Sequence, residues 1–164
     1  MKGSVFLLKV LVVDDEAFVR RGIVMETDWA ALDCMVVGEA DNGRSGVAAA
    51  KKYEPDLIIS DIRMPQMDGI EMLRCLREEG CRAAVIFLTA YSDFSYAQSA
   101  IKLLASDYLL KPFEDGELEA AVGRVKERMD LARKERETER EQKLSLSMLR
   151  AGEKSKYVAE AIAY

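Results

Sequence analysis

The chain has 164 residues, which suits one domain with an extension, and it carries a formal net charge of −5 and no histidine. The lack of histidine excludes His-based catalysis, His-rich metal sites and a phosphohistidine carrier. A basic nucleic-acid surface is also excluded, because residues 1–113 hold 13 Lys and Arg against 17 Asp and Glu, and residues 114–164 hold 11 against 12.

Membrane and disulfide signals are missing from the sequence. No run of about 18 apolar residues predicts a membrane span, and residues 1–8 are too short for a signal peptide. The three cysteines form no C-x-x-C pair, and their odd number argues against a disulfide framework. They are Cys34, Cys75 and Cys81. We therefore expect a soluble, cytoplasmic protein that does not act at a membrane.

Five short apolar runs predict β-strands in the first two thirds of the chain. They are rich in β-branched residues, and four of them stop at a polar residue. Runs that are apolar on both faces are typical of buried parallel strands. The predicted strands are 10–13, 36–40, 57–59, 85–88 and 108–110.

Amphipathic stretches between these runs predict helices. The predicted helices are 16–26, 45–53, 69–78, 93–104 and a last one from residue 114 onward. Five strands that alternate with five helices indicate an α/β fold with a doubly wound, five-stranded parallel sheet.

The last helical pattern is unusually long. From Leu118 to Ala132 its apolar residues follow 4-3-4-3 spacing, as in a heptad seam. Residues 133–143 are then almost entirely charged, and the same register meets charged residues before it reaches Leu146. We therefore predict an extended, solvated C-terminal helix with mixed-sign charge pairs rather than a long coiled coil.

Polar side chains stand where the predicted strands end. Asp14 and Asp15 follow one strand, Asp61 follows another, and Thr89 and Lys111 end two more. In an open α/β sheet, ligands bind just beyond the carboxyl ends of the strands. Three carboxylates at one point repel each other unless a cation neutralises them. Oxygen ligands without His or Cys select a hard cation, so we predict Mg²⁺.

This set of side chains suits phosphoryl transfer. A carboxylate can attack phosphorus and form an acyl phosphate, and the reaction otherwise needs positioning and charge neutralisation. The Lys111 ammonium could offset charge on the phosphoryl oxygens, and the Thr89 hydroxyl could donate a hydrogen bond to one of them. These arguments do not decide which aspartate is the nucleophile. Asp61 is favoured, because Asp14 and Asp15 are adjacent and suit metal binding.

Four motifs in register carry a family resemblance. They are Val12–Glu16, Pro55–Gly69, Leu88–Ala90 and Lys111–Phe113. Together they resemble the response-regulator receiver domain, which is CheY-like, over roughly residues 8–128. The resemblance implies a sheet with strand order 2-1-3-4-5.

The resemblance also implies a role for each matching position. It makes Asp61 the phosphoacceptor. The implied protein ligands of Mg²⁺ are Asp14, Asp15, Asp61 and the backbone carbonyl of Arg63. The implied catalytic and switch residues are Thr89, Lys111 and Tyr108, where Tyr108 is the aromatic that rotates on phosphorylation. A cis peptide bond before Pro112 is also implied, and it would direct Lys111.

Further segments resemble receivers that are fused to an AraC-type helix-turn-helix DNA-binding domain. These segments are 28–29, 38–43 and 90–103. We expect a receiver domain at 1–128, a charged helical linker at 129–152 and the start of a truncated output domain at 153–164. The implied partners are a sensor histidine kinase and a second copy of the chain on phosphorylation. DNA would be bound only through the output domain, which this chain lacks.

Two other functions stay open at this stage. A Mg²⁺-dependent phosphatase could use an aspartyl phosphate, but such enzymes place a second Asp two residues after the nucleophile, where this chain has Arg63. A receiver without phosphorylation chemistry could act only as an interaction module, which the intact acidic pair argues against. We therefore expect no enzyme activity beyond self-phosphorylation and self-dephosphorylation.

Overall fold

The computed structural model describes residues 7–90, 92, 95, 98 and 105–163. The described part forms two compact units, one up to Val125 and the other from Lys126 onward. Most of the predicted helix 93–104 lies outside the described residues.

The first unit is built on a five-stranded parallel sheet. Its strands are β1 (Leu8–Val13), β2 (Cys34–Ala40), β3 (Leu57–Asp61), β4 (Ala84–Ala90) and β5 (Asp107–Lys111). Neighbouring strands run parallel in the order β2-β1-β3-β4-β5. The apolar residues of β3 and the centre of β4 are fully buried, which explains their uninterrupted apolar sequence. The predicted fold class and strand order are confirmed.

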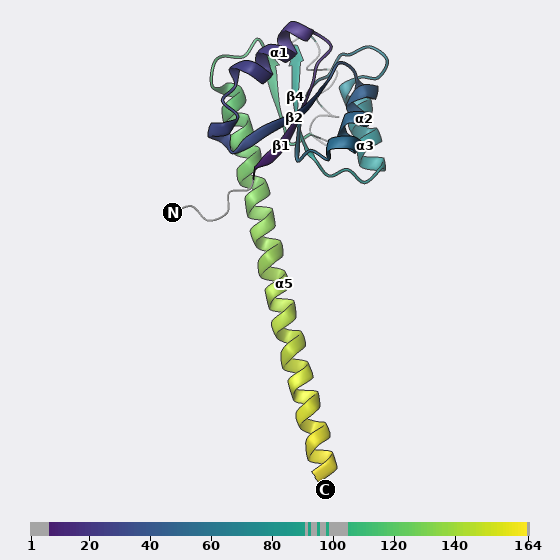
Figure 1. Cartoon of the computed structure of the whole chain (residues 1–164), viewed down its shortest axis with the longest axis vertical. Helices are drawn as coiled ribbons and strands as arrows, with labels where there is room; N and C mark the ends of the chain where they lie inside the picture. Colours follow the sequence, from purple (N-terminus) through teal and green to yellow (C-terminus); the bar gives the residue numbers. More distant parts are fainter. Residues whose placement is uncertain (1–6, 91, 93–94, 96–97, 99–104, 164) are drawn as a thin grey trace. The chain divides into compact units, whose positions relative to one another are not determined.

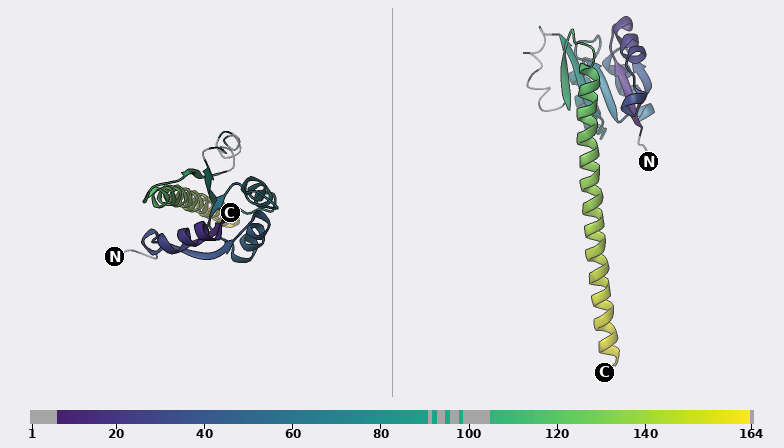
Figure 2. Two further views of the ribbon diagram at one scale, coloured as in Figure 1. Left: turned by 90° about the horizontal axis from the view of Figure 1, so that it is seen from above. Right: turned by 90° about the vertical axis from the view of Figure 1, so that its left-hand side faces the viewer.

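Helices cover both faces of this sheet (Figures 1 and 2). They are α1 (Ala17–Glu26), α2 (Gly43–Tyr53), α3 (Gly69–Glu78) and α5 (Glu117–Ala163), with a short 3-10 helix at Ala30–Leu32. Within the first unit, α1 and the first turns of α5 lie on one face, and α2 and α3 lie on the other. The core on the second face includes Leu11, Ile58, Met72, Leu73 and Phe87, all of them fully buried.

Two helix starts differ from the prediction by two or more residues, each because of one residue. Helix α2 begins at Gly43 instead of residue 45, because the Asn42 side chain caps it by accepting a hydrogen bond from the Ser45 N–H. Helix α5 begins at Glu117 instead of residue 114. Gly116 has φ +89°, in the left-handed region, so a right-handed helix cannot run through it.

The second unit consists of the remainder of α5. Side chains from residue 134 to residue 152 are exposed, in agreement with the predicted solvated helix. Arg133 and Asp130 form an i,i+3 ion pair. Apolar side chains are exposed as well, and these are Leu131, Leu144, Leu146, Met148 and Leu149. Within the described residues, no helix is both long enough and apolar enough to span a membrane.

Candidate functional site

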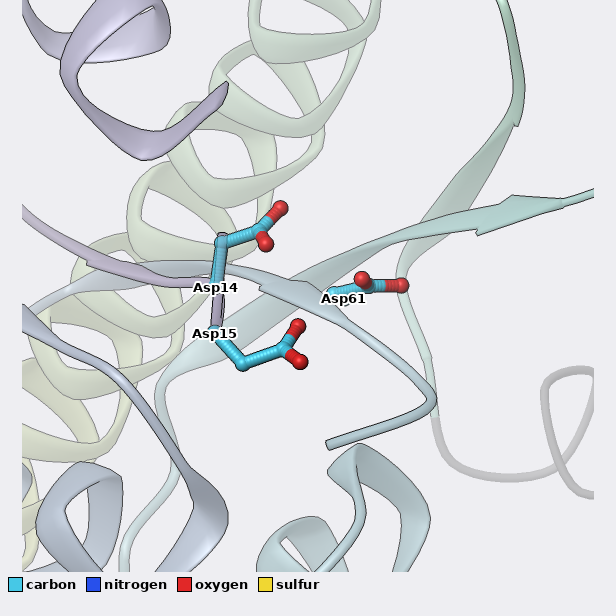
Figure 3. Close-up of side chains that lie close together, drawn as sticks. All are labelled: Asp14, Asp15 and Asp61. Carbon is cyan, nitrogen blue, oxygen red and sulfur yellow. The ribbon is translucent and has the colours of Figure 1, made fainter. Parts of the chain in front are cut away.

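Three aspartates meet at the carboxyl ends of β1 and β3 (Figure 3). The two strands are parallel neighbours, and their register pairs Val13 with Ser60. The residues that follow this pair are Asp14 and Asp61, so the register itself brings their side chains together. One carboxylate oxygen from each of Asp14, Asp15 and Asp61 lies within 4.8 Å of the others.

Hydrogen bonds hold both the backbone and the carboxylate of Asp14. It is fully buried, and its N–H donates to the Ala40 carbonyl at 3.0 Å. One carboxylate oxygen accepts the Glu16 N–H at 2.9 Å, and the other accepts Lys111 Nζ at 3.2 Å. A buried carboxylate is tolerated only with such partners, so Asp14 has a single well-defined position.

Lys111 joins two of the aspartates. It is the last residue of β5, and the following Lys111–Pro112 peptide bond is cis. Its Nζ lies 3.2 Å from Asp14 Oδ2 and 3.3 Å from Asp61 Oδ2. Burial of the ammonium opposes its charge, but the attraction of Asp61 and then of Asp14 outweighs burial and raises the pKa of Lys111. The lysine side chain is therefore positively charged at neutral pH.

Asp61 is in a different electrostatic position. Burial raises the pKa of its carboxyl, Asp14 adds to this, and the attraction of Lys111 with the hydrogen bond from the Ile62 N–H offsets only part of it. The pKa of Asp61 therefore stays above its usual range without a cation. The site carries more negative charge than one ammonium neutralises, which is the condition under which a divalent cation binds well.

This raised pKa gives a pH-dependent stability. The folded chain holds the Asp61 proton more tightly than the unfolded chain. This proton therefore stabilises the fold fully below pH 3.8, the ordinary pKa of an aspartate, and its contribution is lost as pH rises through the higher pKa of the folded state. Without Mg²⁺ at neutral pH, Asp61→Asn should raise the free energy of unfolding by about 1 kcal/mol. Urea unfolding from pH 4 to 8 in a chelator measures it, with exposed Asp115→Asn as the control. Equal effects of both substitutions would contradict the prediction.

Strands β4 and β5 position two of the other predicted site residues, and the loop after β3 carries the third. Thr89 is fully buried near the end of β4, one residue beyond the Asp61 partner Leu88, and its hydroxyl donates to the Ala90 carbonyl at 3.3 Å. Tyr108 lies on β5 opposite Phe87 and is 36% exposed. Arg63 is an exposed residue in the loop after β3.

One side chain that binds a residue of the site is missing from the sequence-based predictions. Arg20 of α1 donates from Nη1 to the backbone carbonyl oxygen of Asp14 at 2.6 Å. A charged residue four positions after Glu16 on an amphipathic helix was the available signal. Sequence periodicity does not show whether such a side chain points to solvent or back to the strand.

The comparisons with known proteins agree on one family. The family model for the response regulator receiver domain matches residues 10–123. The chain belongs to this family, which consists of signalling domains of two-component systems rather than classical enzymes.

Individual relatives come from transcription regulators. The chain is 33% identical to the transcriptional regulatory protein HptR of Staphylococcus aureus over 119 residues, which cover 73% of the chain and 46% of that protein. The REC domain of AraT, a response regulator from Geobacillus stearothermophilus, matches with a TM-score of 0.72 and 38% identity over 78% of the chain and 99% of the domain. A two component transcriptional regulator AraC from Clostridium phytofermentans matches with a TM-score of 0.67 and 35% identity, over 73% of the chain and 93% of that structure. The chain spans about half the length of the curated relatives it matches.

Proposed function

We propose that Asp61 accepts a phosphoryl group from the phosphohistidine of a partner kinase, at a site that also binds Mg²⁺. The observation that carries the proposal is the convergence of three carboxylates and one ammonium from three distant parts of the chain, with Lys111 Nζ 3.2 Å from Asp14 and 3.3 Å from Asp61. Neither a solvated acidic turn nor a purely structural ion pair requires a third carboxylate at this point.

The donor set fits Mg²⁺. Mg²⁺ prefers oxygen ligands, carboxylates among them, and it usually keeps several waters. The site offers one carboxylate oxygen from each of three aspartates, and these oxygens all lie within 4.8 Å of one another. Asp14, Asp15 and Asp61 with the backbone carbonyl of Arg63 would hold the ion. When bound, Mg²⁺ supplies positive charge to the transferring phosphoryl oxygens.

The chain's own residues carry the remaining chemistry. A carboxylate oxygen of Asp61 attacks phosphorus, the bond from phosphorus to the donor nitrogen breaks, and the electron pair stays on that nitrogen, which takes a proton. The positively charged Lys111 ammonium lies beside the Asp61 carboxylate, where it would stabilise the negative charge on the phosphoryl oxygens. Asp14 holds Lys111 at that place. The product is an acyl phosphate on Asp61.

The switch proposal uses Thr89 and Tyr108. The phosphoryl group would draw the Thr89 hydroxyl away from the Ala90 carbonyl, where it now donates at 3.3 Å, and Tyr108 would move into the vacated space. A modification that adds charge and acceptor oxygens at one place can bias such a two-state element. The Thr89 side chain is fully buried, so its displacement would leave a space in the packed interior that a neighbouring side chain must fill.

The output proposal rests on the relatives and on α5. The chain covers about half of its curated relatives, which are transcription regulators, and one solved relative is described as a two component transcriptional regulator AraC. Phosphorylation would promote homodimerisation through the face that includes β5 and the start of α5. The linker 129–152 would then carry the change to an AraC-type output domain that begins at 153–164.

Labelling with acetyl phosphate tests the acceptor site. With Mg²⁺, the chain should gain one phosphoryl group that peptide mapping places on Asp61, and the labelled chain should shift from monomer to dimer in light scattering. A chelator should stop the labelling, because the carboxylates are then left without their cation. A label on another residue, or an Asp61→Asn chain that is still labelled, would refute the proposal. Labelling without dimerisation would refute only the output part.

A further inference from the structure

Arg20 makes a bridge that the proposed chemistry has not yet used. It lies in the second turn of α1, and its side chain is only 16% exposed. Its Nη1 donates to the Asp14 carbonyl oxygen at 2.6 Å, and its Nε donates to Glu39 Oε1 at 3.2 Å. Glu39 lies on β2 and is 25% exposed. The guanidinium therefore ties α1 and β2 to the end of β1.

This bridge fixes the peptide plane between Asp14 and Asp15. The Asp14 N–H is bound to the Ala40 carbonyl at 3.0 Å and its C=O is bound to Arg20, so neither end of the residue can rotate freely. Asp14 is fully buried, and a buried carbonyl that loses its donor is costly. Among the described residues, no side-chain hydrogen bond anchors the exposed Asp15 carboxylate, so the backbone sets its direction.

We propose that Arg20 is a positioning residue of the cation site, which aims the Asp14 and Asp15 carboxylates through the backbone that joins them. The proposal rests on the proposed function, since it concerns the same Mg²⁺ site. Within the described part of the chain, the hydrogen bonds of Arg20 go to the Asp14 carbonyl and to Glu39, and not to a carboxylate of the site or to Lys111. It would act as the hydrogen-bonding partners outside a metal's ligand set do, by orienting the ligands.

The competing role for Arg20 is that of a counter-charge, and it predicts the opposite sign. A cation near three carboxylates lowers their pull on Mg²⁺, so its removal would tighten Mg²⁺ binding. Loss of positioning would weaken binding instead. The direction of the change in Mg²⁺ affinity therefore separates the two roles.

The chain offers a matched control in the neighbouring residue. Arg21 binds the other oxygen of the same glutamate, Glu39 Oε2, at 2.9 Å, and its side chain is 59% exposed. Its hydrogen bond goes to Glu39 and not to Asp14. Arg21→Met thus removes the same charge, beside the same partner, without releasing the Asp14 carbonyl.

Mg²⁺ titration calorimetry of the full chain is the test. We expect Arg20→Met to bind Mg²⁺ about 10-fold more weakly than the wild type, and Arg21→Met to bind within about twofold of it. Arg20→Lys should fall between Arg20→Met and the wild type, because one ammonium cannot serve the Asp14 carbonyl and Glu39 with the geometry of the guanidinium fork. Urea unfolding of each variant checks that the chain is folded. If Arg20→Met does not fold, the Mg²⁺ affinity of Arg20→Lys tests the proposal instead.

Acetyl phosphate labelling adds a second readout, which separates weaker Mg²⁺ binding from damage to the rest of the site. At saturating Mg²⁺ the labelling rate of Arg20→Lys should return to that of the wild type, because Asp61 and Lys111 are unaltered. Unchanged or tighter Mg²⁺ binding by both Arg20 variants would overturn the inference, as would a rate deficit that persists at saturating Mg²⁺. A wild-type chain that binds no Mg²⁺ would instead overturn the proposed function.

Discussion

The Lys111→Met chain is expected to take up phosphoryl groups from acetyl phosphate at least about 100-fold more slowly than the wild type, since removal of one preorganised donor to developing charge typically costs this much. The Lys111 ammonium is the one positive side chain within hydrogen-bond distance of both Asp14 and Asp61 in the described residues. Without it, a phosphoryl dianion would approach carboxylates whose charge only the metal ion offsets. Methionine keeps most of the length and apolar stem of lysine, so the loss reports the charge.

The same substitution should change stability in a metal-dependent way. In a chelator, the two carboxylates lose their shared partner, and the free energy of unfolding should fall by about 2 kcal/mol. The fall is smaller than for a fully buried pair because the lysine side chain is 23% exposed. Added Mg²⁺ should stabilise Lys111→Met more than the wild type, because a ligand that binds a more negative site better shifts the folding equilibrium further.

A surface lysine provides the control for this experiment. Lys51 pairs with Glu79 at 2.9 Å, but its side chain is 59% exposed, and exposed pairs contribute about 0–1 kcal/mol. Lys51→Met should label at the wild-type rate and unfold with nearly the wild-type free energy. A Lys111→Met chain that labels as fast as Lys51→Met would show that the ammonium has no part in the transfer.

Much of the site was predictable because strand ends are easy to find. Buried parallel strands are continuous apolar runs, so the residue where each run stops marks the carboxyl edge of the sheet. Asp61 and Lys111 are 50 residues apart in sequence, yet both end a predicted strand, and the sheet brings them to 3.3 Å. The fold class followed from the same alternation. The strand order came from the motifs, because periodicity alone does not order strands within a sheet.

Features that depend on one backbone torsion or on one side-chain direction were not predictable in the same way. The start of α5 was placed three residues too early, because an apolar and charged pattern is blind to the φ of +89° at Gly116. Arg20 was missed because its contact is with the backbone carbonyl of Asp14. A side chain that binds a main-chain oxygen leaves no complementary residue type in the sequence. The direction of the Asp61 pKa also needs the extent of burial, which only the packed structure gives.

At Gly69, a helix comes close to the backbone of the predicted phosphoacceptor. It is the first residue of α3, and its N–H donates to the Ile62 carbonyl at 2.7 Å. A Cβ at this position would lie 2.4 Å from the backbone carbonyl oxygen of Asp61, 3.0 Å from a ring carbon of Phe87 and 3.2 Å from the Ile62 Cα. Two of these three atoms belong to the backbone, and the third belongs to a fully buried ring. None of them can move aside cheaply.

Gly69→Ala should therefore lower the free energy of unfolding by about 3 kcal/mol, at the upper end of the range for overpacking. The remaining folded chain should label more slowly, because the β3 end that carries Asp61 must shift to relieve the contact. Gly22→Ala is the matched control: it lies inside α1, nothing comes within 4 Å of its added Cβ, and alanine should stabilise the helix there by up to about 1 kcal/mol. The two Gly→Ala changes should thus have opposite signs in urea unfolding. If Gly69→Ala were neutral, the close contact between α3 and the Asp61 backbone would be wrong, and the start of α3 could not be what fixes the position of the Asp61 carboxylate.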